Sequence, residues 1–394
     1  MMQPDEALRL VLENSQPAKS YEQTLLESLG RYLAVPIISQ FDYPAFDHSA
    51  VDGFAIRCED SPGDFLLGHR VLAGDLPSDV FLNERTTVRV LTGAPLPPGF
   101  DAVVMQEECE WEANTVSIAQ RATLGQNVRR RGEEYFAGQT LISAGIEVNS
   151  GIIGLAASNG LSRLTVHRRP RVAVIATGSE LISVGQVPLP GQILDSNSWA
   201  FGAAALSAGA DTTRDVVRDD PLEIGRLVGL AIENSDIVVA SGGVALGDAD
   251  YVRQAFSEQG VREVFFGLSM KPGKGVYFGM QGERLVFGLP GNPAAAMIAF
   301  HLFVRPAIRK LAGAGAPTNH TVLAKLANGQ KKRPGRTEFV QANLRSEVDG
   351  LWADARPKQG SNFLTGMATA DCLMELPPDA ERLERGVTVK VYPL

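Results

Sequence analysis

Three scarcities narrow the class of protein before any motif is considered. The 394-residue chain holds three cysteines, Cys58, Cys109 and Cys372, scattered without a CxxC pair, so neither a disulfide framework nor a cysteine metal site is expected. It has five histidines and no HExxH motif, which disfavours a zinc hydrolase. Its 37 basic residues are outnumbered by 45 acidic ones, which argues against nucleic acid as the main partner.

Long apolar runs are scarce as well. The longest, AAAMIAFHLFV at residues 294–304, contains His301 and is shorter than the roughly 20 residues that a membrane-spanning helix needs. Residues 1–15 are acidic and amphipathic, without the pattern of a secretory signal. The sequence therefore predicts a soluble, cytoplasmic protein with no membrane partner.

The length of the chain predicts several domains. Apolar residues at helical spacing predict helix within residues 4–34, and a second apolar helical segment at 141–168 is expected to pack on it. Between these segments, short β-like runs alternate with Pro/Gly turns. The predicted domains are a helical N-terminal and linker domain (1–40 with 141–169), an inserted mostly-β domain (41–140), an α/β domain (170–312) and a C-terminal β domain (317–394).

The α/β domain shows alternating strand-like and helix-like runs, the pattern of a doubly wound fold. Ser196 or Asn197 is expected to cap one helix, Pro221 to open a second, and Asn292 to cap a third that begins at Pro293. In such a fold, ligands bind beyond the carboxyl ends of the parallel strands. Four strand-to-helix loops with unusual residues should share that edge: 177–180, 219–221, 241–250 and 288–293.

Three of these loops carry acids, Glu180, Asp219 and Asp250. Each acid alone fits the cap or first turn of a helix. Carboxylates at neighbouring strand ends repel one another, however, and a hard cation such as Mg²⁺ would relieve that repulsion while bridging to substrate phosphates. The grouping predicts a Mg²⁺ site.

Other features of this edge suit an anion. Glycines at 242 and 243 follow an apolar strand and would let backbone N–H groups approach an anion, although a tight turn explains them equally well. Lys271 and Lys274 lie on a KPGK turn that suits an anion site, although lysines are most often solvated. The GLPGNP segment reads as a turn and helix start with added backbone contact to a ligand.

The inserted domain is less informative. Asp47, His48 and Ser49 are adjacent, so their side chains cannot align as a catalytic relay. Asp52-Gly53 and Thr92-Gly93 each fit a plain turn as well as a site. The RRRGEEY run at 129–135 is typical of a solvated charged surface.

Taken in order along nearly the whole chain, ten motifs resemble those of the molybdopterin molybdenumtransferases, the MoeA family, also found as a domain of gephyrin. They are DHSAVDGFAIR, LTGAPLPPGFDAVVMQEE, RRRGEEY, ATGSEL, QILDSN, RDDP, SGGVALGDADYV, MKPGKG, GLPGNP and GRTEF. The resemblance implies an α/β domain of the molybdenum cofactor-binding type. It implies an elongated homodimer of four-domain subunits with each site at the subunit interface. The implied reaction is Mg²⁺-dependent insertion of molybdate into adenylylated molybdopterin, with release of AMP.

The resemblance also implies roles for individual residues. Catalytic roles fall on Asp52, Thr92, Glu180, Asp219, Asp250 and Lys271, with Glu180, Asp219 and Asp250 as metal ligands. Ligand-binding roles are expected for Gly178, Ser241, Gly242, Gly243, Lys274, Pro290, Asn292, Arg336 and Ser361. Three positions depart from the family pattern, namely Ala245 for a usual serine, Gly267 for a frequent basic residue, and Gly275 for the final proline of KPGKP.

Two related enzyme classes and one non-enzyme remain as alternatives. Molybdopterin adenylyltransferases and CinA-like nucleotide hydrolases share the α/β domain, but they lack the β domain with SAVDGFA and LTGAP. A gephyrin-like scaffold would bind partner peptides, but the sequence has no long linker or extra domain for that role. Expected partners are a second copy, the adenylyltransferase and molybdoenzyme chaperones.

Overall fold

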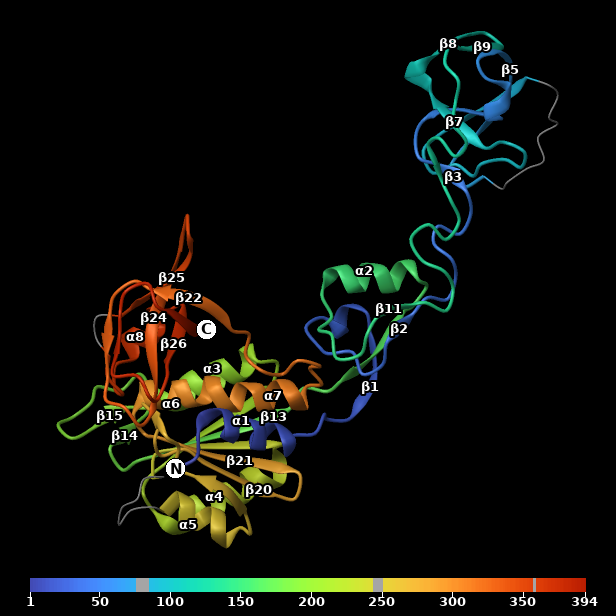
Figure 1. Cartoon of the computed structure of the whole chain (residues 1–394). Helices are drawn as coiled ribbons and strands as arrows, with labels where there is room; N and C mark the ends of the chain where they lie inside the picture. Colours follow the sequence, from blue (N-terminus) through green and yellow to red (C-terminus); the bar gives the residue numbers. More distant parts are fainter. Residues whose placement is uncertain (76–84, 244–250, 357–358) are drawn as a thin grey trace. The chain divides into compact units, whose positions relative to one another are not determined.

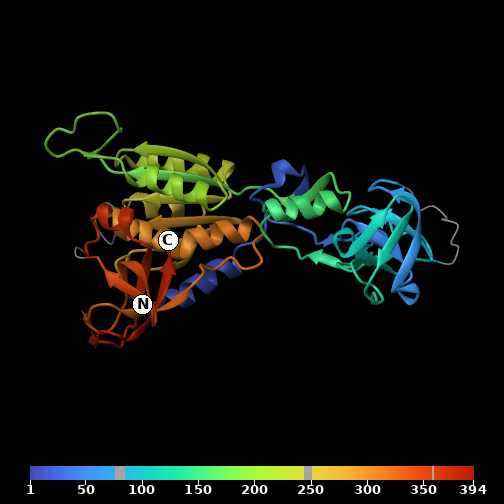
Figure 2. The same ribbon diagram turned by 90° about the horizontal axis from the view of Figure 1, so that it is seen from above.

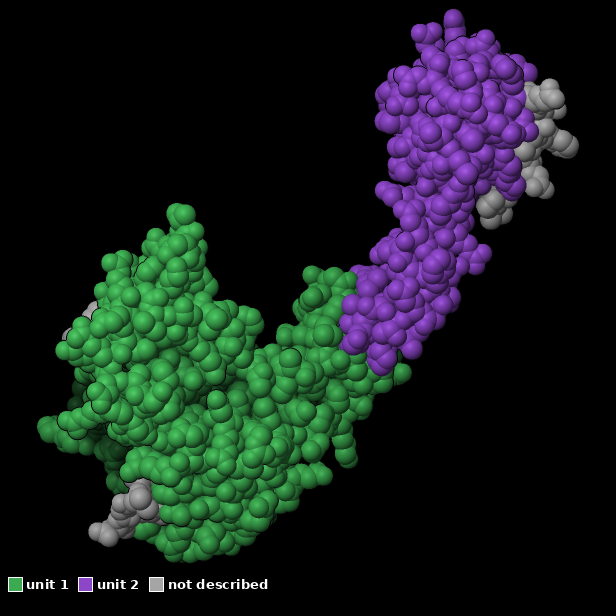
Figure 3. All heavy atoms as spheres, in the orientation of Figure 1, with its two compact units in different colours: residues 1–35, 144–153, 163–394 green, residues 36–143, 154–162 purple. Residues whose placement is uncertain are grey.

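The computed structural model describes residues 1–75, 85–243, 251–356 and 359–394 (Figure 1). They form two compact units, coloured separately in Figure 3. Unit 1 comprises residues 1–35, 144–153 and 163–394, and unit 2 comprises residues 36–143 and 154–162. Among the described residues, no helix combines the length and apolarity needed to cross a bilayer.

Unit 1 is built around a six-stranded sheet of order β16-β13-β17-β21-β20-β18. The first four strands are parallel, and β20 pairs antiparallel with both β21 and the edge strand β18. Its strands are β13 (Arg171–Thr177), β16 (Asp211–Val217), β17 (Ile237–Ser241), β18 (Arg262–Phe266), β20 (Tyr277–Gln281) and β21 (Arg284–Leu289). This arrangement confirms the doubly wound α/β domain predicted from the alternating runs.

Helices cover both faces of this sheet, as Figures 1 and 2 show. One face packs against α1 (Pro4–Glu13), α3 (Asn197–Ser207), α6 (Pro293–Ala299), the π-helical η4 (Phe300–Val304) and α7 (Arg305–Leu311). The other face packs against α4 (Pro221–Asn234) and α5 (Tyr251–Glu258). Alternate strand residues feed the two cores: Val172 and Val174 face the first, and Ile175 faces the second.

Local capping explains where α4 begins. The Asp220 carboxylate accepts hydrogen bonds from the backbone N–H groups of Leu222 and Glu223, and Pro221 occupies the first helical turn. Asn292 and Ser196 also stand at N-cap positions, but their side chains make no capping hydrogen bond. The predicted capping roles of these two side chains are therefore wrong, although the helices begin where predicted.

The C-terminal part of unit 1 is a closed five-stranded barrel, because β24 pairs with β25 and β26, β25 with β22, β22 with β28, and β28 with β26. Its strands are β22 (Val322–Leu326), β24 (Thr337–Glu347), β25 (Gly350–Ala355), β26 (Cys372–Leu376) and β28 (Thr388–Pro393). Smaller elements here are β23 (Gln330–Lys331), β27 (Arg382–Leu383) and α8 (Leu364–Thr369). Closure leaves no free sheet edge.

The predicted helix over residues 4–34 is wrong beyond Glu13. Residues 20–24 form strand β1 (Ser20–Thr24), which pairs along its length with β12 (Arg163–His167), and only a single 3-10 turn, η1 (Leu26–Ser28), follows. The predicted helix at 141–168 likewise reduces to α2 (Ser150–Ser158). Strand pairing between segments distant in sequence overrides helical spacing here.

Unit 2 contains a six-stranded sheet of order β7-β4-β6-β5-β9-β8, consistent with the mostly-β texture of this region. Its strands are β4 (Gly53–Ile56), β5 (Gly63–Val71), β6 (Thr86–Val90), β7 (Ala102–Met105), β8 (Cys109–Glu112) and β9 (Thr115–Ile118). Two short pairs join β3 (His48–Ser49) to β10 (Val128–Arg129) and β2 (Ile37–Ile38) to β11 (Thr140–Ile142). The 3-10 turns η2 (Cys58–Asp60) and η3 (Gln106–Glu108) and buried clusters on both sheet faces complete the unit.

Candidate active site

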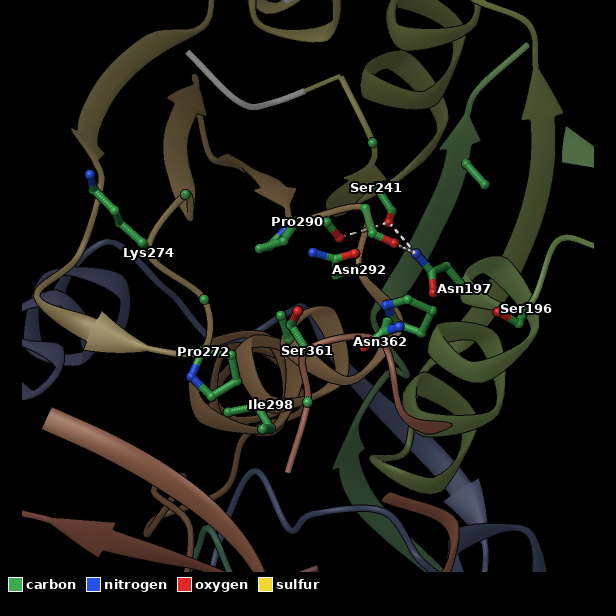
Figure 4. Close-up of a pocket in the computed structure, with 18 of the residues that line it drawn as sticks. Ser196, Asn197, Ser241, Pro272, Lys274, Pro290, Asn292, Ile298, Ser361 and Asn362 are labelled. Atoms are coloured by element: carbon green, nitrogen blue, oxygen red, sulfur yellow. Dashed lines mark hydrogen bonds between the residues drawn. The ribbon is translucent and has the colours of Figure 1, made fainter. Parts of the chain in front are cut away.

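A cavity of about 1160 Å³ opens at the carboxyl ends of the parallel strands in unit 1. The loops after β13, β17 and β21, the turn after β19 (Met270–Lys271), and the barrel all contribute to its wall (Figure 4). Of the sequence-predicted residues, twelve line it: Gly178, Glu180, Asp219, Ser241, Gly242, Gly243, Lys271, Lys274, Pro290, Asn292, Arg336 and Ser361. Asp250 and Ala245 lie outside the described residues.

The glycines after β17 are required by the shape of the loop. Gly242 has φ +92°, and a Cβ there would lie 2.4 Å from the carbonyl oxygen of Thr177. Gly243 has φ +61°, and a Cβ there would lie 3.0 Å from the Val252 side chain. Because both positions need glycine for the turn and for close packing, their geometry supports the tight-turn interpretation, and their contact with an anion stays a prediction.

Asn197 joins three elements at the cavity wall. Its Nδ2 donates to Ser241 Oγ at 2.8 Å and to the Gly291 carbonyl at 2.8 Å, and Ser241 Oγ donates to the Pro290 carbonyl at 3.2 Å (Figure 4). The start of α3 is thereby tied to the ends of β17 and β21. Sequence reasoning treated Asn197 only as a helix cap; its place in the QILDSN motif was the available signal that it lies at the cavity.

The acidic part of the cavity contains Asp219 and Glu180. Asp219 Oδ2 accepts a hydrogen bond from the Ser179 N–H at 2.9 Å, and the Asp219 N–H donates to Ser179 Oγ at 3.2 Å. The Glu180 carboxylate lies over Gly178, where a Cβ would come within 2.8 Å of Oε2. Among the described residues, no group of three or more His, Cys, Asp or Glu side chains is gathered closely enough to hold a metal.

The cationic part of the cavity is formed by Lys271, Lys274 and Arg336. Strand β19 pairs in parallel with barrel strand β24, which places Lys271 opposite Glu338. Lys271 Nζ lies 3.3 Å from both carboxylate oxygens of Glu338, which also lines the cavity. Sequence reasoning missed Glu338, although residues i and i+2 of a strand share a face, and Arg336 stands two positions before it.

The start of α6 is occupied by the chain itself. The N–H groups of Ala294 and Ala295 donate to the Ser361 carbonyl at 2.9 and 3.1 Å. The first free amides of this helix therefore hold the barrel loop that carries Ser361. A ligand that contacts the backbone of the GLPGNP segment, as predicted, would therefore have to use groups other than the N–H groups of Ala294 and Ala295.

Asp52 and Thr92 belong to unit 2, where they contact each other. Asp52 Oδ1 accepts hydrogen bonds from the Thr92 N–H at 2.8 Å and from Thr92 Oγ1 at 2.9 Å. These two bonds, helped by the charges of Arg89 and Arg70, hold the pKa of the Asp52 carboxyl below its usual value. Asp52 is thus an oriented and ionised carboxylate.

The neighbouring DHS segment forms no catalytic relay, as expected. The Asp47 carboxylate pairs with Arg130 Nη1 at 2.7 Å and accepts the Arg131 N–H at 2.8 Å, while Ser49 Oγ donates to the Val51 carbonyl. The arginine run at 129–131 was interpreted as a solvated charged surface. Its residues are exposed, but each forms an ion pair with an acid of unit 2.

The fold and the cavity define a multidomain α/β protein with a ligand site at the carboxyl edge of its parallel strands, closed on one side by a β-barrel. Three family models match the chain: the MoeA N-terminal region (domain I and II) over residues 2–160, a probable molybdopterin binding domain over 173–310, and the MoeA C-terminal region (domain IV) over 323–394.

Individual relatives agree with these matches. The chain is 35% identical over 379 residues to the molybdopterin molybdenumtransferase of Nostoc sp., covering 93% of this chain and 86% of the relative. It is 32% identical over 406 residues to molybdopterin molybdenumtransferase 2 of Mycobacterium tuberculosis, covering both chains completely. A crystal structure of the molybdopterin biosynthesis moeA protein from Pyrococcus horikoshii OT3 superposes with a TM-score of 0.87 at 27% identity, covering 100% of both chains.

The chain belongs to the MoeA family of molybdopterin molybdenumtransferases, enzymes of molybdenum cofactor biosynthesis. The family resemblance expected from the ten motifs is thereby confirmed. Because the matches extend over both β regions as well as the α/β domain, they also disfavour the alternatives that share the α/β domain alone.

Proposed function

We propose that this protein inserts molybdenum from molybdate into adenylylated molybdopterin, in a Mg²⁺-dependent reaction that releases AMP. The observation that carries the proposal is a single cavity with carboxylates on one part of its wall and Lys271, Lys274 and Arg336 on another. The proposed reaction needs both kinds of group: carboxylates to hold Mg²⁺ at the phosphates of adenylylated molybdopterin, and cations to bind the molybdate oxyanion. The family relationship supplies the identity of that substrate.

The cationic residues are suited to an oxyanion. Lys271 and Lys274 lie on a turn whose backbone is restrained by Pro272 and by the pairing of β19 with β24. Arg336 comes from the barrel segment just before β24. Charge-assisted hydrogen bonds from ammonium and guanidinium groups to oxyanions are about twice as strong as neutral ones. These residues would bind and orient molybdate beside the pterin dithiolene.

The acidic residues are suited to Mg²⁺. This ion is commonly held by one or two carboxylates together with substrate phosphates, and Glu180 and Asp219 supply two carboxylates to the cavity. Asp219 Oδ2 is held by the Ser179 N–H, and no described residue donates to Oδ1, so that oxygen is available to a cation. When bound, the ion would neutralise phosphate charge at the adenylyl bond. Asp250, the third expected ligand, lies outside the described residues.

We place the reaction in the cytoplasm and include a homodimer in the proposal, because the family resemblance implies a site completed by a second copy. In this arrangement Asp52 and Thr92 of one subunit act at the cavity of the other. The resemblance further suggests a molybdopterin adenylyltransferase as the supplier of substrate and molybdoenzyme chaperones as acceptors of product.

The central experiment follows AMP release from purified adenylylated molybdopterin with Mg²⁺ and molybdate, using wild type, Asp219→Asn and Asp220→Asn. Asp219→Asn should lower kcat by about a hundredfold or more, as expected for the loss of a metal-binding carboxylate. Asp220→Asn is the matched control, because asparagine caps helices as well as aspartate does. Undiminished AMP release by the Asp219→Asn protein would contradict the proposal.

Mixing variants tests the homodimer. Asp52→Asn and Asp219→Asn proteins should each retain at most about a hundredth of wild-type activity alone. If each site takes residues from both copies, mixed dimers contain one intact site, and re-equilibrated mixtures should recover about a quarter of wild-type activity. Absence of recovery in mixtures shown by mass analysis to contain mixed dimers would refute the shared site and leave the reaction itself untouched.

A further inference from the structure

An acidic side chain stands among the cations of the cavity. Glu338 lines the same wall as Lys271 and Arg336, and both of its carboxylate oxygens lie 3.3 Å from Lys271 Nζ. Its side chain is 12% exposed, whereas that of Lys271 is 56% exposed. A carboxylate repels an incoming oxyanion, so its presence in an anion-binding wall needs a reason.

The backbone holds this pair firmly. Parallel pairing of β19 with β24 puts Lys271 directly opposite Glu338, and antiparallel pairing with β26 puts Leu376 on the other side of Glu338. At Glu338, β24 is therefore hydrogen-bonded to a neighbouring strand along both edges, and β24 is itself a strand of the closed barrel. Lys271, by contrast, is the last residue of a two-residue strand and the first residue of the KPGK turn. The rigid member of the pair is the carboxylate.

One lysine nitrogen can serve two partners. An ammonium group has three N–H donors, and the two similar contacts to Glu338 leave at least one donor that can face the cavity. A flexible four-carbon side chain loses rotamer freedom when it binds a ligand, at a cost in affinity. A carboxylate that already holds the ammonium removes part of that cost before the anion arrives.

The carboxylate also reduces the charge of this wall. Lys271, Lys274 and Arg336 together with Glu338 leave a net formal charge of +2 at the part of the cavity formed by the KPGK turn and the barrel. Without Glu338, the same wall would attract any small oxyanion more strongly. Its negative charge weakens the binding of every small oxyanion, molybdate included, and so allows a bound oxyanion to exchange.

We propose that Glu338 is a positioning residue for the oxyanion; this inference rests on the function proposed above. It holds the Lys271 ammonium at the cavity wall, where that group donates to molybdate, and it limits the positive charge that molybdate meets. Glu338 makes no contact with the reacting atoms and acts through Lys271.

Two substitutions separate these roles. Glu338→Gln removes the charge but keeps an acceptor for Lys271, so molybdate and sulfate should both bind more tightly than in wild type. Glu338→Ala removes the charge and the anchor, so molybdate should bind about fivefold more weakly than in the Gln variant, the loss expected from one hydrogen bond. In a Lys271→Met background, the difference between Gln and Ala should vanish.

The measurement is calorimetric titration of the folded full-length proteins with sodium molybdate and with sodium sulfate, beside the molybdate dependence of AMP release. Asp349→Asn is the control, because Asp349 pairs with Lys325 at 2.7 Å on the same barrel and does not line the cavity. Equal affinities of the Gln and Ala variants, or a difference that persists in the Lys271→Met background, would overturn the inference. Molybdate binding that follows the expected order without molybdate-dependent AMP release would support Glu338 and refute the proposed reaction instead.

Discussion

The two ends of the parallel strands in unit 1 use charged residues in opposite ways. At the amino ends, the Asp236 carboxylate accepts three hydrogen bonds, two from the Arg168 guanidinium at 2.6 and 2.7 Å and one from the Arg171 N–H at 2.7 Å. At the carboxyl ends, Asp219 accepts one hydrogen bond from a described residue, and it lines an open cavity. The aspartate at the amino ends is thus occupied by hydrogen bonds within the protein, whereas the aspartate at the carboxyl ends faces a cavity that can hold a ligand.

This difference distinguishes a carboxylate that stabilises the fold from a carboxylate that can bind a ligand. Burial alone raises the pKa of the Asp236 carboxyl, but the hydrogen bonds from Arg168 and Arg171 outweigh burial and bring that pKa below its usual value. A group satisfied in this way stabilises the fold and has nothing left to offer a ligand. Substitutions at the two edges should therefore have separable effects, on stability at one and on activity at the other.

The largest expected effect on the use of molybdate is at the carboxyl edge. Lys271→Ala removes a cation and leaves the Glu338 carboxylate unpaired in the cavity, so half-saturation of AMP release should need about tenfold more molybdate or greater. The free energy of unfolding should fall by no more than about 1 kcal/mol, since the lysine side chain is 56% exposed and the pair lies at an open cavity. Lys325→Ala is the control, because Lys325 pairs with Asp349 on the barrel and does not line the cavity. An unaltered molybdate dependence would show that Lys271 is only a surface residue.

At the amino edge, Asp236→Ala should lower the free energy of unfolding by about 2 kcal/mol, because hydrogen bonds to a charged, mostly buried group are lost. Specific activity of the folded protein should be preserved. Denaturant unfolding followed by circular dichroism measures the free energy of unfolding, and AMP release measures the specific activity. Asp211→Asn, whose contact to Arg169 spans 3.9 Å at an exposed site, should have little effect. Loss of activity without loss of stability would remove the distinction between the edges.

The same carboxylate predicts a pH dependence. The folded-state pKa of Asp236 is lowered from 3.8, so its stabilising contribution is fully present above the unfolded-state pKa. That contribution is lost as the pH falls through the folded value. Between about pH 5 and pH 3, wild type should lose more stability than Asp236→Asn does. Parallel stability curves for the two proteins over that range would contradict this linkage.

The smallest expected effect concerns the cap that begins α4. Asp220→Ala should cost about 1 kcal/mol of stability, whereas Asp220→Asn should cost much less, because alanine cannot accept from the N–H groups of Leu222 and Glu223. Thermal unfolding of the two variants measures the difference. Equal losses would mean that the cap hydrogen bonds contribute little in this setting.

Local signals in the sequence were sufficient for much of the α/β domain. Pro221 and the acid before it mark the start of α4, and the apolar run before Ser241 marks a buried strand, because caps and strand periodicity depend on neighbouring residues. Since the carboxyl ends of parallel strands share one edge, the same reasoning brought Glu180, Asp219 and Ser241 to one cavity. Gly242 and Gly243 were recognised as loop residues for the same local reason.

Contacts between distant segments were decided by tertiary structure. Residues 20–24 became a strand because β12 was available to pair with them, against the helical spacing of their surroundings. The Ser361 carbonyl reached the amides at the start of α6, where the sequence indicated only Asn292 as a cap.

The Lys271–Glu338 pair on the cavity wall shows both contributions. The sequence by itself determined that Lys271 lies on a restrained basic turn, because that signal is local, and the family resemblance pointed to Arg336 in the GRTEF motif. Only the fold decided that Glu338, 67 positions further along the chain, meets Lys271. The physical reason is that the register between β19 and β24 is set by backbone hydrogen bonds and by barrel closure, which no short stretch of sequence encodes.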